Sequence, residues 1–358
     1  MSQKEPIILA IESSCDDTSA AILKNESILS NLIAGQDVHR LYGGVVPELA
    51  SRAHLQNILP VVDAAIEKAG VQLSDIEAIA FTKGPGLLGS LVVGTSFAKS
   101  LALALNIPLI DVNHMYGHVL AHFIDDEEEE TIVSDGVLTG GPIKKKKPKF
   151  PFICLTVSGG HTQVVLVKNH LDMEIIGTTK DDAAGEAFDK AAKMLGFEYP
   201  GGPLVDKHAK DGDPLKFKFT RPKVGGYDFS FSGLKTGILY FLQKEVKANP
   251  NFIEENLNDL CASIQFTIVD ILIRQLKTVT KDLGIKEVAI AGGVSANSGL
   301  RRALQETGAN KGWNVYIPRF EYCTDNAAMI AITGKFMFEQ GLFADQTVTA
   351  MARVPFAR

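Results

Sequence analysis

The sequence predicts an α/β fold made of two duplicated lobes. The segments that start at Ile7 and at Phe152 each contain an apolar β run, a short polar or Gly-containing turn and a second β run. This order is typical of a hairpin, and the repetition indicates a duplicated unit. Strand and helix patterns follow each hairpin. With 358 residues and 46% hydrophobic content, the chain can bury a large core in two lobes.

The first half continues with alternating elements. Residues 54–69 have a helical pattern, and residues 76–82 form an apolar run that predicts a buried strand. The turn Gly84-Pro85-Gly86 then opens a helix over about residues 90–105.

In the second half, a long helix is predicted from Asp259 to about Asp282. A strand at 287–291, the turn Gly292-Gly293 and a helix from about Ser298 follow. Strand, Gly-Gly turn and helix form a nucleotide-cleft arrangement, because glycines allow the backbone to approach a ligand. The amide of Asn297 can hydrogen-bond a ribose or a base edge.

Composition limits the classes of function. The formal charge of −6 argues against general coating of nucleic acid, although a local basic patch can bind RNA on an acidic protein. The four cysteines lie far apart without a CxxC pair, which predicts reduced thiols. The N-terminus lacks the features of a signal or transit peptide, and no apolar run approaches about 20 residues. We therefore expect a cytoplasmic protein with no membrane association.

A charged segment interrupts the chain at 125–150. Residues 125–130 are acidic and residues 144–149 are almost entirely basic. We expect a mobile surface insertion whose halves partly neutralise each other, and a solvated loop is favoured over a dedicated RNA arm.

Two histidines four residues apart indicate a metal site. His114 and His118 would project from one face of a helix and could chelate one ion. Asp325, just ahead of an alanine-rich helix, is the best candidate for a third ligand. Two histidines and one carboxylate leave open positions, as in a catalytic site. The alternatives are ordinary helix histidines and a zinc protease, but the protease needs Glu where Met115 stands.

Taken in order, these motifs resemble the TsaD family, the bacterial tRNA N6-adenosine threonylcarbamoyltransferases. The family belongs to the Kae/Qri/TsaD superfamily, formerly called O-sialoglycoprotein endopeptidase. The resemblance runs from about residue 7 to about residue 343. It implies the actin/Hsp70/sugar-kinase-like (ASKHA) fold, with two duplicated lobes around a nucleotide cleft.

The resemblance also implies the reaction and its partners. The family moves the threonylcarbamoyl group from threonylcarbamoyl-AMP to N6 of the adenosine 3′ of the anticodon, in tRNAs that read codons beginning with A. AMP leaves and N6-threonylcarbamoyladenosine (t6A) forms. A TsaB-like paralogue and a TsaE-like ATPase are the implied partners, and a TsaC-type enzyme supplies the adenylate. The helix around residues 49–59 is a candidate docking face.

Site residues follow from the same resemblance. His114, His118 and Asp325 match the ligands of one divalent metal ion, Fe²⁺ or Zn²⁺, between which the sequence does not choose. The acidic positions Glu12 and Asp16 match groups near the phosphates, where we infer that they position metal or water. The implied phosphate loop is Thr156, Val157, Ser158, Gly159 and Gly160, and the implied adenosine contacts are Asp189, Gly202, Asp206 and Asn297.

Structural alternatives exist for several of these residues. Asp189 could be a solvated helix carboxylate beside Lys193, and Gly202 could simply precede a helix. Glu12 could be a strand-end surface residue. Two positions depart from the usual family pattern: Tyr116 stands where an acidic residue is common, and Asp17 where Glu is common.

Domain limits and RNA contacts complete the predictions. We expect an N-terminal lobe at 1–112, with the helix at about 326–345 packing back on it, and a C-terminal lobe at 113–325 that carries the metal and nucleotide site. Residues 215–223 alternate basic and aromatic side chains as an extended RNA-binding strand would, or as a half-buried strand would. Arg301, Arg302 and the lysines at 144–147 are further RNA candidates.

The rival function from another class is an ATP-dependent small-molecule kinase or a nucleotide-switching module of the same fold. Phosphoryl transfer on this fold normally uses carboxylates and Mg²⁺. The predicted histidine-held metal therefore favours the RNA-modifying transferase.

Overall fold

A computed structural model describes residues 6–36, 39, 42–125 and 146–356, together with the backbone of four short strands between 126 and 145. In the charged insertion predicted at 125–150, the residues between 126 and 145 that lie outside these strands also lie outside the described residues. Its strands are β6 (Glu127–Glu129), β7 (Ile132–Ser134), β8 (Val137–Thr139) and β9 (Pro142–Lys144), with β6 paired to β9 and β7 to β8.

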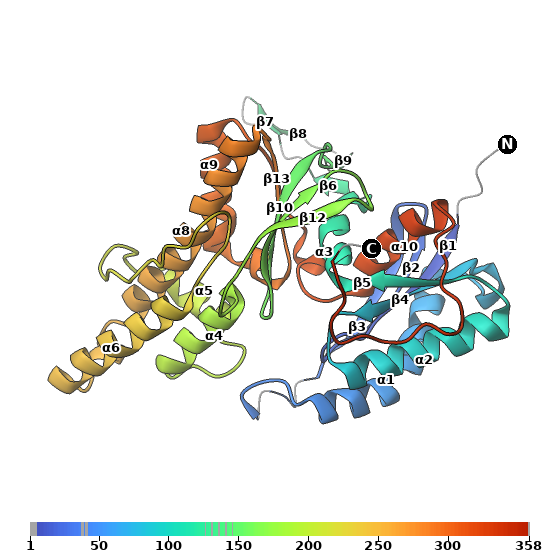
Figure 1. The fold of residues 1–358 in the computed structure, drawn as a ribbon, viewed down its shortest axis with the longest axis horizontal. Helices are drawn as coiled ribbons and strands as arrows, with labels where there is room; N and C mark the ends of the chain where they lie inside the picture. The colour runs from blue at the N-terminus through green and yellow to red at the C-terminus, as the bar shows by residue number, and fades with distance from the viewer. Residues whose placement is uncertain are drawn as a thin grey trace. The chain divides into compact units, whose positions relative to one another are not determined.

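The chain divides into two compact units (Figure 1). The first unit comprises residues 1–36, 47–149 and 325–355, and the second comprises 37–46, 150–324 and 356–358. The predicted limit at residue 112 differs from this division. Residues 113–124 stay with the first unit because α3 (His114–Leu120) directly follows β5 (Leu109–Asn113) and packs against α10 (Ala327–Glu339).

The first unit is built on a five-stranded sheet in the order β3-β2-β1-β4-β5. β1 pairs antiparallel with β2 and parallel with β4, which in turn pairs parallel with β5. The strands are β1 (Ile7–Glu12), β2 (Thr18–Lys24), β3 (Ser27–Ala34), β4 (Ala78–Gly84) and β5 (Leu109–Asn113).

The second unit repeats the same sheet, in the order β12-β11-β10-β13-β14. Its first strand again pairs antiparallel with the second and parallel with the fourth. This equivalence confirms the predicted duplication. The strands are β10 (Phe152–Val157), β11 (Thr162–Val167), β12 (Met173–Thr178), β13 (Glu287–Ala291) and β14 (Asn314–Tyr316).

Helices cover both faces of the first sheet. Alternate strand residues such as Leu9 and Phe81 share a core with Ile58 of α1 (Pro47–Ala69) and Ala98 of α2 (Leu88–Leu105). On the opposite face, Gly334 of α10 lies against Ala80. Strand residues alternate in direction, so one short apolar strand serves both layers.

The second unit has a single large core on the face of Ile153, Leu155 and Val157. The long helix predicted from Asp259 is α8. The apolar side chains that recur along it are fully buried: Leu260, Ile264, Ile268, Leu272, Leu276 and Val279. The helices of this unit are α4 (Ala184–Met194), α5 (Gly201–Ala209), α6 (Ser232–Ala248), α7 (Phe252–Glu255), α8 (Leu257–Leu283) and α9 (Ser298–Lys311). Short 3-10 turns lie at Leu73–Asp75, Ala121–Phe123, Gly293–Ala296 and Phe320–Tyr322.

Helix α2 is long and apolar enough to cross a membrane by length and composition alone. Its buried residues include Ser90, Gly94, Ala98 and Ala102, which recur every four positions and form one face. That face packs on β4 and α1. One face of the helix therefore packs within the first unit, while Leu88, Val92 and Leu103 remain exposed.

The strand predicted at 215–223 does not form. These residues lie in irregular chain, and their alternating aromatic rings instead contact α6 and α7, where Phe217 meets Phe241 and Phe252. Packing of the rings against helices, rather than pairing with a strand, explains the alternation.

Close contact between α10 and β4 depends on Gly334. A Cβ there would lie 2.6 Å from the Cβ of Ala80. We expect Gly334→Ala to lower the free energy of unfolding by about 1–3 kcal/mol, because overpacking outweighs the gain in helix propensity. Urea denaturation measures the change. Gly225→Ala, where nothing lies within 4 Å, is the control. An equal effect at both positions would contradict this packing.

Candidate functional site

The two histidines are held by a short buried helix. Asn113 ends β5 and caps α3, since its side chain accepts a hydrogen bond from the backbone N–H of Met115 at 2.9 Å. His114 and His118 then lie on one face, with ring centroids 4.7 Å apart. Gly117 allows close packing against α10, because a Cβ there would lie 3.0 Å from the Met329 side chain.

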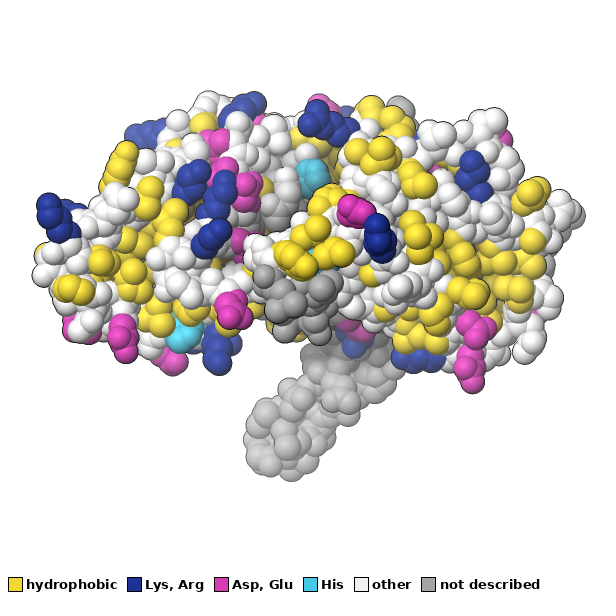
Figure 2. Space-filling view, turned by 90° about the horizontal axis from the view of Figure 1, so that it is seen from below, with side chains coloured by type: hydrophobic (Ala, Val, Ile, Leu, Met, Phe, Trp, Pro, Cys, Tyr) yellow, Lys and Arg dark blue, Asp and Glu magenta, His cyan; other side chains and the backbone are white. Residues whose placement is uncertain are grey.

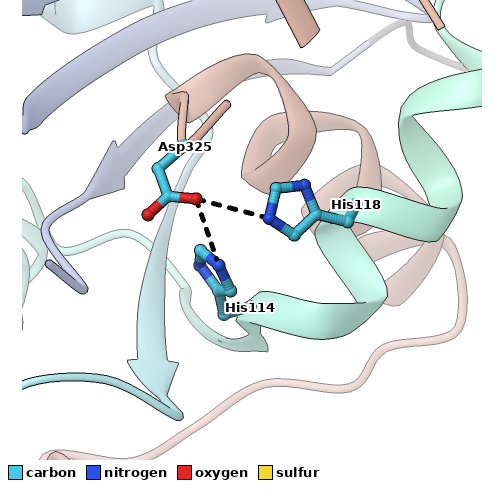
Figure 3. A group of neighbouring side chains, drawn as sticks. All are labelled: His114, His118 and Asp325. Carbon is cyan, nitrogen blue, oxygen red and sulfur yellow. Dashed lines mark ion pairs between the residues drawn. The ribbon is translucent and has the colours of Figure 1, made fainter. Parts of the chain in front are cut away.

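Asp325 reaches the same point from the start of α10. Asn326 caps α10 by accepting from the N–H of Met329, and the N–H of Ala327 donates to Ser19 Oγ. Asp325 Oδ1 lies 3.4 Å from His114 Nε2 and 3.3 Å from His118 Nε2 (Figure 3). The predicted group is therefore assembled within the first unit, and its ligand atoms all lie within 4.8 Å of one another.

The chemistry of this group fits a divalent metal ion. Both ring nitrogens of His118 are buried and neither makes a well-formed hydrogen bond among the described residues, although Nε2 lies within ion-pair distance of Asp325; this is costly for an imidazole. A metal at Nε2 would satisfy one of them. The Asp325 side chain retains 29% exposure, so the group opens to solvent on one side. Two imidazoles and one carboxylate suit Zn²⁺ or Fe²⁺ with positions left open.

Glu12 is fully buried behind His114. Its carboxylate accepts hydrogen bonds from Thr82 Oγ1 and from the backbone N–H of Ser14, and Oε2 lies 3.0 Å from His114 Nδ1. If the proton of neutral His114 is on Nδ1, then Nε2, which faces Asp325, is free to bind a metal. Carboxylate, histidine and metal form a frequent arrangement in which the carboxylate fixes the ring and its tautomer. Glu12 is thus not a strand-end surface residue.

The charges in this group stabilise one another. Burial raises the pKa of Glu12, but His114 more than offsets this effect and the pKa is lowered overall. Burial lowers the pKa of His114, yet Asp325 and Glu12 raise it well above the usual range. Burial likewise raises the pKa of Asp325, and the two histidines reverse the shift. Without a metal, the group is an imidazolium between two carboxylates.

Asp16 lies half-exposed in the turn between β1 and β2. The turn is backed by α2: Gly94 lies so close that a Cβ would be 2.2 Å from Ser13 Oγ, and Gly86 similarly approaches Ser14. The N–H of Leu87 donates to the carbonyl of Ser14 at 2.7 Å. These contacts fix the backbone that presents Asp16.

The predicted phosphate loop belongs to the second unit. Thr156 and Val157 are buried at the end of β10, and Ser158 Oγ accepts from the N–H of His161. A Cβ at Gly159 or Gly160 would meet nothing within 4 Å, so this backbone is open.

Two other glycines pack against this loop. Gly292, with φ of +86°, lies so close that a Cβ would be 2.5 Å from the carbonyl oxygen of Val157. A Cβ at Gly185 would be 2.6 Å from the carbonyl oxygen of Ser158. Strand ends and a helix start thus converge on exposed backbone, which is how proteins bind phosphate.

The predicted adenosine contacts connect two helix starts in the second unit, those of α5 and α9. Asp189 Oδ1 accepts from the N–H groups of Gly201 and Gly202 at 3.0 Å each, and burial raises its pKa. Asp206 accepts from both the N–H and the hydroxyl of Ser298. Asn297 caps α9 and donates to Gln265. Each side chain therefore has a structural task, while Asp189, Gly202 and Asp206 remain half-exposed.

Several supporting residues escaped sequence reasoning. Asn113 and Asn326 directly precede helix starts, and this position is a recognisable capping signal. Thr82, Ser19 and Gln265 carry no local signal, because each reaches its partner across the fold.

Solved structures share this architecture. A crystal structure of full-length HypF in phosphate- and nucleotide-bound form matches with a TM-score of 0.60 at 14% identity, over 96% of this chain and 48% of that chain. Component A of (R)-2-hydroxyglutaryl-CoA dehydratase from Acidaminococcus fermentans matches with a TM-score of 0.50 at 16% identity, over 92% and 98% of the two chains. Fold and site thus define an ASKHA-type α/β protein with a candidate His2Asp metal centre.

Sequence comparison defines the family. The family model described as "TsaD: tRNA N6-adenosine threonylcarbamoyltransferase" matches residues 27–139 and 134–332. Relatives of that name from Riemerella anatipestifer and Christiangramia forsetii are 59% and 58% identical, covering 98% and 99% of this chain and 98% and 100% of theirs. The chain belongs to the TsaD family and is a transferase.

The buried charges predict how stability depends on pH in metal-free protein. Folding raises the pKa of His114, so the protonated ring stabilises the folded state. This stabilisation is complete at pH values below the pKa of the unfolded chain, about 6.5, and is lost as the pH rises through the pKa of the folded state. The free energy of unfolding should therefore fall above about pH 6.5 in wild type and less steeply in His114→Gln. Urea denaturation after chelation measures both curves. Parallel curves would show that His114 is not held as imidazolium.

Proposed function

We propose that this protein transfers the threonylcarbamoyl group from threonylcarbamoyl-AMP to N6 of the adenosine 3′ of the anticodon, in tRNAs that read codons beginning with A. The product is t6A. Membership of the TsaD family supports the reaction. The main structural support for locating the active site is the group of His114, His118 and Asp325. A tRNA substrate agrees with the cytoplasmic location expected from the sequence.

The reaction needs an electrophile held rigidly and a leaving group stabilised. The N6 nitrogen attacks the carbamoyl carbon, the bond from that carbon to the phosphate oxygen breaks, and AMP leaves with the electron pair while N6 loses a proton. Negative charge therefore grows on the phosphate oxygen. Preorganised donors and cations aimed at that charge lower the barrier.

His114, His118 and Asp325 would hold one divalent metal ion, Fe²⁺ or Zn²⁺. When bound, it supplies Lewis-acid stabilisation of oxygen charge. Glu12 would act through His114 as a positioning residue, because its contact with Nδ1 fixes the ring. Asp16, half-exposed in the turn that follows β1, would orient water.

The second unit would bind the adenylate portion. The open backbone at Gly159 and Gly160 offers N–H groups to phosphate. Asp189 uses Oδ1 for the start of α5, which leaves Oδ2 to accept a ribose hydroxyl. Gly202, Asp206 and Asn297 surround the same helix starts and would shape the adenosine pocket.

Removal of His114 tests the function directly. Unmodified tRNA is incubated with threonylcarbamoyl-AMP, the protein and its proposed partners, and the nucleosides are analysed by mass spectrometry. Wild type should produce t6A, and His114→Ala should abolish it while circular dichroism stays native, because one metal ligand is lost. Near-wild-type turnover by the variant would contradict the metal assignment.

A graded variant and a control sharpen this test. Glu12→Ala should weaken metal affinity about 10–100-fold, as loss of a group that orients a ligand does elsewhere. Metal content measured by mass spectrometry gives a readout independent of activity. The control is His208→Ala. The His208 ring contacts Asn258 in the second unit, so this variant should keep wild-type activity and metal content.

The rival ATP-dependent kinase predicts a different result. It requires ATP turnover on a small molecule without tRNA. The site gives it less support, because phosphoryl transfer normally uses Mg²⁺ bound by carboxylates and phosphates rather than by imidazoles. Absence of t6A together with such turnover would replace the proposed function.

A TsaB-like paralogue would dock on α1 and α2, with a TsaE-like ATPase joining the complex and a TsaC-type enzyme supplying the adenylate. Ala50, His54 and Ile58 of the predicted docking segment face the core. Leu55 and Leu59, one turn apart, are instead exposed by 66% and 64%. Figure 2 shows hydrophobic side chains gathered over the part of the first unit where these helices lie. Such a face fits a helical partner.

Charge on this face should block docking. Leu55→Glu/Leu59→Glu should weaken binding of the TsaB-like paralogue at least about 30-fold, the effect of removing an interface hot spot. Isothermal titration calorimetry measures the affinity. Leu215→Glu, at an equally exposed leucine of the second unit, serves as control. Unchanged affinity in the double variant would exclude these leucines from the interface.

A further inference from the structure

Four of the basic residues expected to contact RNA, Lys216, Arg221, Lys147 and Arg301, are engaged within the protein. Lys216 Nζ lies 2.7 Å from Asp259 Oδ2, and Arg221 Nε pairs with Asp270. Lys147, within the predicted insertion, bridges Glu26 and Asp125. Each pair removes most of the local positive charge. Binding of a polyanion to a chain with a net charge of −6 requires a surface where cationic charge is locally uncompensated.

Arg301 is engaged in a different way. Its guanidinium donates to the carbonyl groups of Ser295 and Pro318 and lies 3.9 Å from the centroid of the Phe320 ring. These contacts fix the segment that follows β14. The side chain is therefore a poor RNA ligand.

A lysine pocket in the second unit differs from all of these. It has a volume of about 470 Å³ and is formed where α8 ends, β13 begins and α9 leads into β14. Its lining includes Lys277, Lys281, Lys286, Lys311, Asp282 and Trp313. We call these residues the lysine pocket.

The charge of the pocket is uncompensated. All four lysines are exposed, and within the described residues none forms an ion pair. Asp282 is the one carboxylate in the lining, and it accepts a hydrogen bond from the Tyr227 hydroxyl at 3.3 Å. Four ammonium groups against one carboxylate leave three positive charges.

Helix stability accounts for only part of this arrangement. Lys281 and Lys311 lie in the last turns of α8 and α9, where a cation complements the helix dipole. Lys277 lies farther back on α8, four residues from Lys281, where like charges destabilise a helix by a few tenths of a kcal/mol. Lys286 lies beyond the helix. An anionic ligand explains all four together.

Trp313 indicates which anion. It is the chain's single tryptophan, half-buried against the core of the unit, and it forms part of the pocket wall. A free inorganic anion gains nothing from an indole surface. RNA can use both the lysines and the indole, since its phosphates contact cations while its bases or sugars pack on aromatic rings.

The position of the pocket fits a long ligand. β13 runs from the pocket at Lys286 to the turn at Gly292, so the two lie at opposite ends of a five-residue strand, roughly 17 Å apart. The pocket is thus remote from the candidate phosphate loop, which contacts Gly292. A ligand that uses both must be a polymer.

We propose that the lysine pocket binds the sugar-phosphate backbone of the RNA substrate. The identity of that RNA as tRNA rests on the proposed function, whereas binding itself does not. The lysines supply affinity that depends on salt, and Trp313 supplies a stacking surface. The contact holds the RNA at a distance from the reacting base and reads no sequence there.

The test replaces Lys277, Lys281, Lys286 and Lys311 together by alanine in the full-length protein. The control replaces Lys24, Lys210, Lys244 and Lys247, four exposed lysines outside the pocket, and so changes the net charge equally. Fluorescence anisotropy measures the affinity for unmodified tRNA over a series of salt concentrations. The pocket variant should bind at least about tenfold more weakly, with a salt slope smaller by about 2–3, while the control stays near wild type.

Further readouts separate the outcomes. Thermal melting verifies that both variants fold. If transfer is detected, the pocket variant should show a raised KM for tRNA and an unchanged kcat, because the reacting groups are untouched. Absence of transfer in wild type would defeat the proposed function and leave the binding result intact. Equal tRNA affinity in the two variants would overturn the proposal that the lysine pocket binds RNA. Binding of pyrophosphate is measured as well. If the pocket variant lost pyrophosphate binding but kept its tRNA affinity, the pocket would be a small-anion site and the proposal would also fail.

Discussion

Burial of one carboxylate, Glu12, constrains the first unit more than any other interaction. A charged group without exposure must have all its partners supplied, or folding is penalised by several kcal/mol. The partners come from three places: Ser14 in the following turn, Thr82 on β4 and His114 on α3. Satisfying Glu12 therefore fixes the register of the sheet, the hairpin turn and the first metal-site histidine at once.

The sequence predicted most of what local pattern can encode. The duplicated hairpins, the buried stripe of α8 and the histidine spacing all depend on periodicity, which a single chain displays. Asp325 was the best candidate for the third ligand because it precedes an alanine-rich helix, and the family resemblance implied the same residue. The prediction of a strand at 215–223 was wrong. Aromatic and basic residues alternate in the same way whether the rings pack against a sheet or against helices, so the pattern could not distinguish the two. The lysine pocket stayed hidden, since its four lysines are spread over 35 positions of sequence.

Duplication of the sheet has not produced duplicated chemistry. In both units the turn between the first two strands is backed by close glycine contacts, at Gly86 and Gly94 in one and at Gly185 and Gly292 in the other. The first turn carries acidic groups beside histidines, whereas the second exposes bare backbone. One scaffold thus offers carboxylates and imidazoles in one copy and N–H donors in the other.

The return of α10 to the first unit bears on how the nascent chain acquires its structure. The core of that unit is assembled from β1, β2 and β4, which are made early, and from a helix that ends at Glu339. During synthesis, the stretch 150–324 can collapse around its own core while the earlier strands still lack one covering layer. The first sheet must therefore wait, with an apolar face open, until α10 has left the ribosome. Chaperone capture should concentrate on that interval.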